Sequence, residues 1–204
     1  LNSPNNPSGT GHFNLEELAR VARKNELIVI SDEIYAELDY MGSYQSLTHY
    51  YPEGTIVSGG LSKWCGAGGW RLGTMVFPDQ LIDIRNVLRA TASETFTSVS
   101  APIQYAAIKG FSSDHSQYLE KSRAILNYVA CFVHSELNSV GIKSVKPSGG
   151  FYILCDFSEI LRKSNTIIND NDLCKQLLED TGVATLPGSD FGLNSKDKII
   201  RLAF

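Results

Sequence analysis

The sequence lacks the features that mark nucleic-acid-binding and membrane proteins. Its 204 residues hold 18 basic against 22 acidic ones, a formal net charge of −4, and no run of lysine and arginine, which argues against a surface for nucleic acid. No apolar stretch approaches the roughly 20 residues that cross a bilayer. A hydrophobic content of 43% suits a protein with a core. We therefore expect neither nucleic acid nor a membrane as a partner.

Cysteine is scarce and shows no pattern. The four cysteines, Cys65, Cys131, Cys155 and Cys174, have no CxxC spacing and lie in apolar or helical surroundings. This favours buried, reduced thiols over disulfides. We therefore expect a cytoplasmic protein, and we predict no metal site.

Both ends of the sequence lack the signals of a complete chain. Leu1 stands directly in a loop rich in proline and asparagine, with no signal-peptide pattern. The last residues, 199–204, form an apolar run without a terminating turn. We therefore expect the sequence to be part of a longer protein.

Loop, helix and strand alternate in the first half. Asn14 is placed to cap a helix, with Glu17 at the capping-box position. The apolar run 27–30 predicts a strand covered on both faces, and residues 55–58 and 72–77 predict two more strands. This order indicates an α/β layer. The buried stripe of the first helix is expected to comprise Leu15, Leu18, Ala19 and Ala22.

The second half is dominated by helices. A long amphipathic pattern runs from about residue 114 to 139 and ends before Gly141. A strand near residues 151–155, a helix over 171–180 and two short strands follow. Residues 110–114 are small and polar, which places a domain boundary near residue 112. We expect a large domain over residues 1–112 and a small one over residues 113–204.

The segment from Ser58 to Gly73 carries the clearest candidate site. Lys63 follows a predicted strand and precedes a glycine-rich turn, which is where open α/β sheets bind ligands. Small residues let the backbone approach a phosphate, and Arg71 supplies a planar fork for it. A dinucleotide site is disfavoured because position 71 is not glycine. A surface lysine in a flexible loop is the alternative interpretation.

Three other places carry candidate residues. Asp32 ends the predicted strand and Tyr35 follows it, a plausible partner pair for a heteroaromatic cofactor. Capping of the next helix by Asp32 would explain the pair equally well. Residues 6–9 alone predict a turn. Arg201 follows two isoleucines, which usually indicates an exposed strand face; a buried arginine there would need a carboxylate partner.

Together these positions resemble the class I/II aminotransferases of the fold-type I pyridoxal-phosphate (PLP) enzymes. The likeness runs from Asn6 to Arg201. Each motif is weak alone, but six in the family's order are specific. They are Asn-Pro-Ser-Gly at 6–9, Asp-x-x-Tyr at 32–35, Ser-Lys at 62–63 with Gly-Trp-Arg at 69–71, Pro-x-Gly-Gly-Phe-Tyr at 147–152, Pro-Gly-Ser-x-Phe-Gly at 187–192 and Ile-Arg-Leu-Ala-Phe at 200–204.

The resemblance implies a fold and an activity. The fold would be the C-terminal part of a large PLP-binding domain, with a mainly parallel sheet and helices on both faces, plus a smaller α+β domain. The activity would be transamination between an amino acid and a 2-oxo acid in a homodimer. Two alternatives stay open. One is another PLP reaction on this scaffold, such as C–S lysis or decarboxylation, and the other is an inactive fragment that keeps only the fold.

The resemblance also assigns catalytic roles. Lys63 would hold PLP as a Schiff base and, once the substrate amine has displaced it, move the Cα proton. Asp32 would pair with the pyridine nitrogen and keep it protonated. Tyr35 and Asn6 would donate hydrogen bonds to the ring oxygen, and Asn6 would also contact the substrate.

The remaining implied roles are in binding. Ser62 and Arg71 would bind the phosphate, and Arg201 would bind the substrate α-carboxylate as a bidentate pair. The sequence departs from the family at Gly60, where a serine often contacts the phosphate, so binding should depend more on Ser62 and Arg71. Aspartate-specific members use a further arginine; residues 93–100 contain none, which favours neutral or aromatic substrates.

Overall fold

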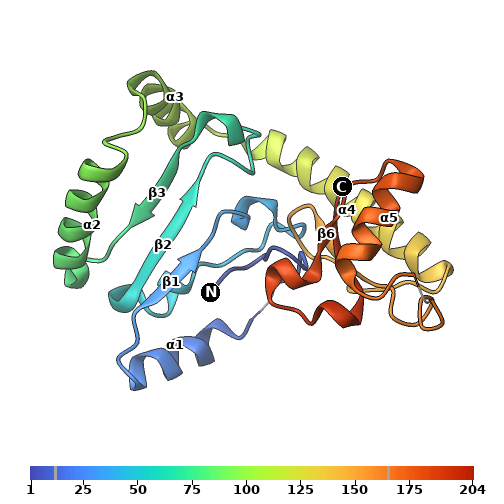
Figure 1. The fold of residues 1–204 in the computed structure, drawn as a ribbon. Helices are drawn as coiled ribbons and strands as arrows, with labels where there is room; N and C mark the ends of the chain where they lie inside the picture. Colours follow the sequence, from blue (N-terminus) through green and yellow to red (C-terminus); the bar gives the residue numbers. More distant parts are fainter. Residues whose placement is uncertain (12, 165) are drawn as a thin grey trace. The chain divides into compact units, whose positions relative to one another are not determined.

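The computed structural model describes residues 1–11, 13–164 and 166–204, and its chain forms two compact units (Figure 1). Unit 1 comprises Leu1–Ser3, His12–Leu38 and Gly42–Glu120. Unit 2 comprises Pro4–Gly11, Asp39–Met41 and Lys121–Phe204. The division therefore falls within the long helix α4 (Ser116–Ser139), and two short early segments belong with the C-terminal unit. The domain boundary near residue 112 stays a prediction.

Unit 1 contains a three-stranded mixed sheet. Its strands are β1 (Val29–Asp32), β2 (Thr55–Gly60) and β3 (Gly73–Val76), in the order β1-β2-β3. β1 and β2 are parallel, with Asp32 opposite Ser58, whereas β3 is antiparallel to β2. The α/β prediction is confirmed, but in the described chain the expected mainly parallel sheet has one parallel and one antiparallel pair.

The first strand differs from its prediction in its bounds and in its burial. It begins at Val29 rather than Leu27 and continues through Asp32. Coverage on both faces was expected, yet Ile28 is 49% and Ile30 55% exposed. That expectation does not hold in the described chain, because about half of each side chain is exposed.

Helix α1 (Leu15–Lys24) forms as its cap predicts. The Asn14 Oδ1 accepts a hydrogen bond from the Glu17 N–H at 3.0 Å. Ala19 and Ala22 are buried against Leu47 and Tyr51 in a small core cluster. Leu18, expected in the buried stripe, is 40% exposed, so the stripe is narrower than predicted.

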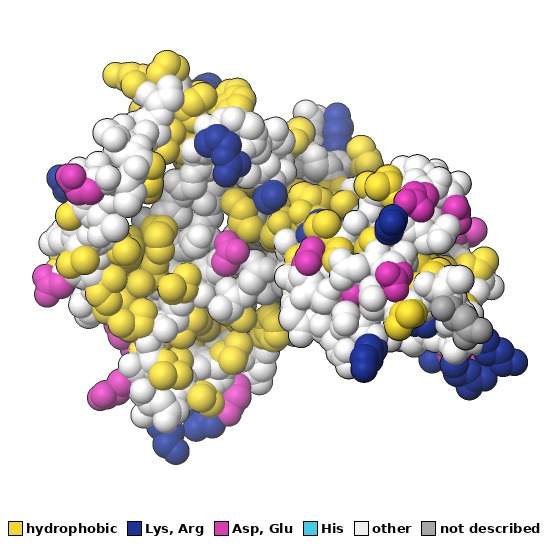
Figure 2. Space-filling view, in the orientation of Figure 1, with side chains coloured by type: hydrophobic (Ala, Val, Ile, Leu, Met, Phe, Trp, Pro, Cys, Tyr) yellow, Lys and Arg dark blue, Asp and Glu magenta, His cyan; other side chains and the backbone are white. Residues whose placement is uncertain are grey.

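Two further helices of unit 1 leave apolar side chains exposed. In α2 (Ile82–Thr95) no residue is buried, and in α3 (Ala101–Ser112) the buried residue is Ala107. Figure 2 shows apolar side chains gathered over the part of unit 1 that holds the sheet. The exposed apolar residues of β3, α2 and α3 include Met75, Val76, Val87, Leu88, Tyr105, Ile108 and Phe111.

Unit 2 is an α+β unit built on an antiparallel sheet. Strands β4 (Lys143–Ser144), β5 (Tyr152–Asp156), β6 (Leu186–Pro187) and β7 (Ile199–Ala203) lie in the order β4-β5-β7-β6. Helix α5 (Asp170–Thr181) ends at Gly182, which is left-handed as a C-cap glycine should be. The core comprises Ile142, Ile153, Cys155, Leu173 and Ile200.

Short 3-10 helices connect these elements. None of the described helices combines the length and the apolarity needed to cross a bilayer. The four cysteines are all described, and each is a free thiol; burial raises the pKa of the Cys155 thiol to about 12. The 3-10 helices are η1 (Ala36–Leu38), η2 (Leu47–His49), η3 (Pro52–Gly54), η4 (Gly68–Trp70), η5 (Asp79–Leu81), η6 (Gly188–Phe191) and η7 (Ser195–Asp197).

Candidate active site

Asp32 is the last residue of β1, at the carboxyl end of the parallel strand pair. Its backbone N–H donates to the Leu1 carbonyl at 2.7 Å. The Asn2 amide donates to the Asp32 carbonyl at 3.0 Å and to its Oδ2 at 3.2 Å. These contacts fix both the backbone and the carboxylate, which is half-buried. Asp32 thus stands at the sheet edge where a ligand would be expected.

The turn after Asp32 is held by a cluster of hydrogen bonds around Glu33. The Glu33 N–H donates to the Ser58 carbonyl at 2.8 Å. Its carboxylate accepts from the hydroxyls of Ser31 at 3.1 Å and Ser46 at 2.6 Å. Burial, together with the Glu33 carboxylate, raises the pKa of Tyr44, so this phenol stays neutral. These hydrogen bonds hold the residue that directly follows Asp32. The local sequence pattern did not predict them.

The structure brings Lys63 and Tyr35 together. Tyr35 is 4% exposed, and the Lys63 Nζ lies 5.7 Å from the centre of its ring. Lys63 is half-buried on the loop that follows β2. Its neighbour Trp64 is buried and donates from Nε1 to the Gly60 carbonyl at 3.1 Å. The loop is therefore anchored on both sides of the lysine, which disagrees with a surface lysine in a flexible loop.

Gly60 has a structural reason to be glycine. Its φ of +155° belongs to the region that favours glycine. A Cβ there would lie 2.7 Å from the Leu72 carbonyl oxygen and 3.2 Å from the Gly73 Cα. The close approach of β2 to β3 thus excludes the serine that the family often has at this position.

Ser62 and Arg71 flank the glycine-rich turn. The Ser62 hydroxyl forms no hydrogen bond with any described residue, and its side chain is half-buried. Arg71 is exposed and left-handed, with φ 56° and ψ 46°, and its Nη1 donates to the Gly68 carbonyl at 2.8 Å. Both residues therefore keep donors for an oxyanion, which is what a phosphate requires.

In unit 2, Asn6 lies on a loop that is closely packed against residues 147–152. The N–H groups of Ser148 and Gly149 donate to the Gly9 carbonyl at 2.8 and 3.0 Å. Gly9 has a φ of +68°, and a Cβ there would collide with the Tyr152 carbonyl oxygen. The Asn-Pro-Ser-Gly motif is thus a turn, as predicted, and it also fixes where Asn6 stands.

Arg201 lies on β7, between β5 and β6. Its Nη1 donates to the Asn6 Oδ1 at 2.8 Å. Its guanidinium carbon lies 4.2 Å from the Tyr152 ring centre and 5.0 Å from that of Phe191. Its Nε is buried and has no hydrogen-bond partner in the described chain. A half-buried guanidinium with unused donors and two aromatic walls is suited to binding a carboxylate.

The predicted site residues therefore form two clusters, each within one unit. Unit 1 holds Asp32, Tyr35, Ser62, Lys63 and Arg71, and unit 2 holds Asn6 with Arg201. The roles assigned to them stay predictions. The sequence motifs contain Tyr152 and Phe191 but do not predict that their rings lie on Arg201, because each ring belongs to a different element from the arginine.

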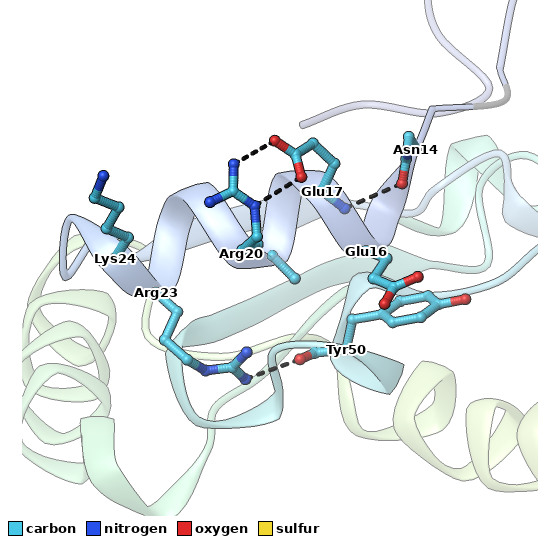
Figure 3. A pocket seen from close by; sticks show the side chains of 8 residues that line it. Asn14, Glu16, Glu17, Arg20, Arg23, Lys24 and Tyr50 are labelled. Atoms are coloured by element: carbon cyan, nitrogen blue, oxygen red, sulfur yellow. Dashed lines mark hydrogen bonds and ion pairs between the residues drawn. The ribbon is translucent and has the colours of Figure 1, made fainter.

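A hollow on helix α1 does not offer a second site (Figure 3). It has a volume of about 600 Å³ and is lined by charged side chains. Arg20 is paired with Glu17 at 2.6 Å, and Arg23 donates to the Tyr50 carbonyl at 2.8 Å. The Glu17 carboxylate has its pKa lowered mainly by the hydrogen bond from Arg20. These exposed charges satisfy one another and form a solvated helix face.

Comparison with known proteins identifies the family of the chain. The model of the family "Aminotransferase class I and II" matches residues 1–204. An aspartate aminotransferase of Bacillus sp. (strain YM-2) is 33% identical over 98% of this chain and 51% of its own length. The aromatic-amino-acid aminotransferase 2 of Thermococcus litoralis is 33% identical over 94% and 49%.

Solved structures give the same result. A double mutant of Thermus thermophilus aspartate aminotransferase superposes with a TM-score of 0.86 at 30% identity, covering 100% of this chain and 51% of that one. The chain thus spans about half the length of the relatives that it matches. The family model, the sequence relatives and the shared fold agree with one another, and the chain belongs to the aminotransferase class I and II family.

Proposed function

We propose that the full-length protein containing this chain is a PLP-dependent aminotransferase that moves an amino group between an amino acid and a 2-oxo acid. The observation that carries the proposal is the placement of Lys63. It follows β2 on an anchored loop, beside the buried Tyr35, while Asp32 ends the neighbouring parallel strand. Members of this family depend on PLP, and a lysine, a carboxylate and a phenol are the groups that such a cofactor needs.

The residues present fit PLP. Ser62 and Arg71 keep donors that no described residue uses, and they flank a turn of small residues that a phosphate can approach. Asp32 offers a fixed carboxylate for the ring nitrogen. When bound, the cofactor supplies an electron sink for the charge that remains on the substrate Cα after its proton leaves.

The chain's own residues would perform the remaining work. The Lys63 amine would hold the cofactor. Once the substrate amine has displaced it, the Lys63 amine would move the Cα proton. The Tyr35 hydroxyl would donate a hydrogen bond to the ring oxygen of the cofactor. Arg201 would bind the substrate α-carboxylate as a bidentate pair. The Asn6 contact at 2.8 Å holds the guanidinium in place for this task.

We propose a substrate with a neutral or aromatic side chain. The relatives carry both aspartate and aromatic amino acids in their names, so ancestry leaves the choice open. Residues 93–100 hold no arginine for a side-chain carboxylate, and Phe96 and Tyr105 are exposed aromatic residues of the same region. We further propose that the full-length protein is a cytoplasmic homodimer, in line with its family and with its free cysteines.

A half-reaction separates transamination from other PLP chemistry. With a suitable amino acid and no 2-oxo acid acceptor, the full-length enzyme should produce about one equivalent of 2-oxo acid per active site and then stop. A panel of aspartate, glutamate, tyrosine, phenylalanine and leucine would identify the donor. Continuous release of ammonia, sulfide or carbon dioxide would favour C–S lysis or decarboxylation instead. No reaction with any donor would favour a protein that keeps the fold alone.

A further inference from the structure

The guanidinium of Arg201 lies against two aromatic rings that belong to different elements. Tyr152 lies on β5, where Leu154 pairs directly with Arg201, so its ring stands on the same sheet face one diagonal position away. Tyr152 is 7% exposed and is fixed by the sheet. Phe191 instead ends η6, a single turn outside the sheet. One wall of the arginine site is therefore part of a strand, whereas the other depends on how firmly this turn is held.

Asp170 holds that turn. It is the first residue of α5 and is 0% exposed. Its Oδ2 accepts a hydrogen bond from the Ser189 N–H at 2.7 Å, a distance typical of a charge-assisted bond. Its Oδ1 accepts from the Asn171 amide at 3.3 Å. Ser189 stands two residues before Phe191, so the carboxylate acts on the middle of the turn.

Close packing fixes the same turn from its other side. Gly188 lies against β7, since a Cβ on it would stand 2.7 Å from the Ile199 carbonyl oxygen. The Gly192 N–H, just after the turn, donates to the Ser189 carbonyl at 3.1 Å. The turn thus has little freedom to shift while Asp170 is in place.

Capping of α5 does not account for Asp170. Asn169 and Asp172 already form a complete capping box, with the Asp172 N–H donating to Asn169 Oδ1 at 2.9 Å and the Asn169 N–H donating to Asp172 Oδ2 at 3.3 Å. Burying a carboxylate is costly unless its hydrogen bonds compensate for lost hydration. The partial positive charge of the helix N-terminus reduces this cost. The structure therefore keeps a buried carboxylate whose shortest bond goes to the turn that carries Phe191.

We propose that Asp170 is a positioning residue for the carboxylate site: it fixes η6, so that Phe191 presses the Arg201 guanidinium against Tyr152 in one orientation. The inference rests on the proposed role of Arg201 in binding the substrate carboxylate. Without the hydrogen bond to Ser189, η6 moves and the Phe191 ring no longer packs on the guanidinium. The guanidinium then samples orientations in which it does not form a bidentate contact with the substrate carboxylate.

The test uses three variants of the full-length enzyme. Asp170→Ala removes the acceptor, and Asp170→Asn keeps an oxygen that can still accept from Ser189. Asp172→Ala is the matched control, because it breaks the capping box of the same helix end without touching the turn. Two quantities are measured for each: the rate at which phenylglyoxal modifies Arg201, by peptide mass spectrometry, and KM and kcat for an α-amino acid and for an amine without a carboxylate.

Asp170→Ala should raise the KM for the amino acid by about 10-fold, the effect of losing one hydrogen bond to a charged group, with a smaller change in kcat. It should also increase the modification rate of Arg201 several-fold and leave the reaction of the amine unchanged. Asp170→Asn should stay within about 2-fold of wild type in both measurements. Asp172→Ala should lower the melting temperature without changing either quantity.

Wild-type kinetics and modification in Asp170→Ala would overturn the proposal, as would equal effects in Asp172→Ala. If Asp170→Ala does not fold, a loss in Asp170→Asn equal to that of an Arg201 variant would contradict it, because the amide retains the acceptor. The modification rate needs no activity. A wild-type enzyme without transaminase activity, but with Arg201 exposed by Asp170→Ala, would therefore refute the proposed function and leave the positioning role intact.

Discussion

The role that can be inferred for Arg201 depends on the residues that contact it in the structure. In the sequence, an arginine after two isoleucines fits an exposed strand face as well as a binding site. In the structure it is half-buried, bonded to Asn6 at 2.8 Å and stacked on Tyr152 at 4.2 Å, while its buried Nε has no partner among the described residues. A charge in this setting calls for an anion, which an exposed strand position would not.

Replacing Arg201 by lysine tests this reading at the residue scale. Lysine keeps the charge but cannot form a planar bidentate pair. In the full-length enzyme, Arg201→Lys should keep its colour and fold but lose about 30- to 1,000-fold in kcat/KM, corresponding to roughly 2–4 kcal/mol. The loss should be far smaller for an amine without an α-carboxylate. Equal losses for both substrates would show that Arg201 supports the structure, and unchanged kinetics would make it an ordinary strand residue.

At the scale of elements, the loop 4–11 of unit 2 is as important as any strand. Its Gly9 needs a positive φ of +68° and touches the backbone of residues 147–152. It thereby sets the position of Asn6 and, through it, of Arg201. The loop Pro4–Gly11 is thus an integral part of a unit that otherwise comprises Asp39–Met41 and Lys121–Phe204.

Gly9→Ala should therefore destabilise the full-length protein by at least about 2 kcal/mol, because a left-handed conformation and a backbone collision are both imposed on the new Cβ. Chemical denaturation measures the change. Gly110→Ala is the control: it lies in helix α3, its Cβ would meet side-chain atoms of Leu61 at 3.5 Å, and alanine is the better helix former. A Gly9 variant as stable as the Gly110 variant would show that the loop is not fixed as described.

Local signals were sufficient to predict most elements. The helix capped by Asn14, the strands near 55–58 and 72–77, and the helices near 114–139 and 171–180 all occur within a few residues of their expected bounds. The errors concern packing. The bounds of β1 and the exposure of Leu18 depend on what packs against each segment, and a single sequence does not encode these partners locally.

In the candidate site, too, the sequence predicts some features and not others. Lys63 and Asp32 could be predicted from strand ends and motifs, because the carboxyl ends of parallel strands meet at one edge. The supporting contacts could not. The bond from Ser189 to Asp170 and the ring of Phe191 on Arg201 join residues of different elements, and the Glu33 cluster joins residues 31 and 46 through one carboxylate.

At the scale of the whole molecule, the chain corresponds to about half of each relative that it matches. Unit 1 shows apolar side chains on its surface, among them Ile28, Ile30 and Val87 (Figure 2). Large exposed apolar surfaces are typical of sites that contact another protein, a ligand or a membrane. Activity and cofactor binding are therefore properties to be tested on the full-length protein.

The most direct test of the account is where PLP attaches. The full-length protein incubated with PLP should absorb visible light, and reduction with borohydride should fix the cofactor on the peptide that contains Lys63. Lys63→Ala should abolish both the absorption and the label. Lys24 and Lys109 serve as internal controls, because the account gives them no role. A label on either of them, or an undiminished label in Lys63→Ala, would contradict the assignment of Lys63 and with it the proposed function.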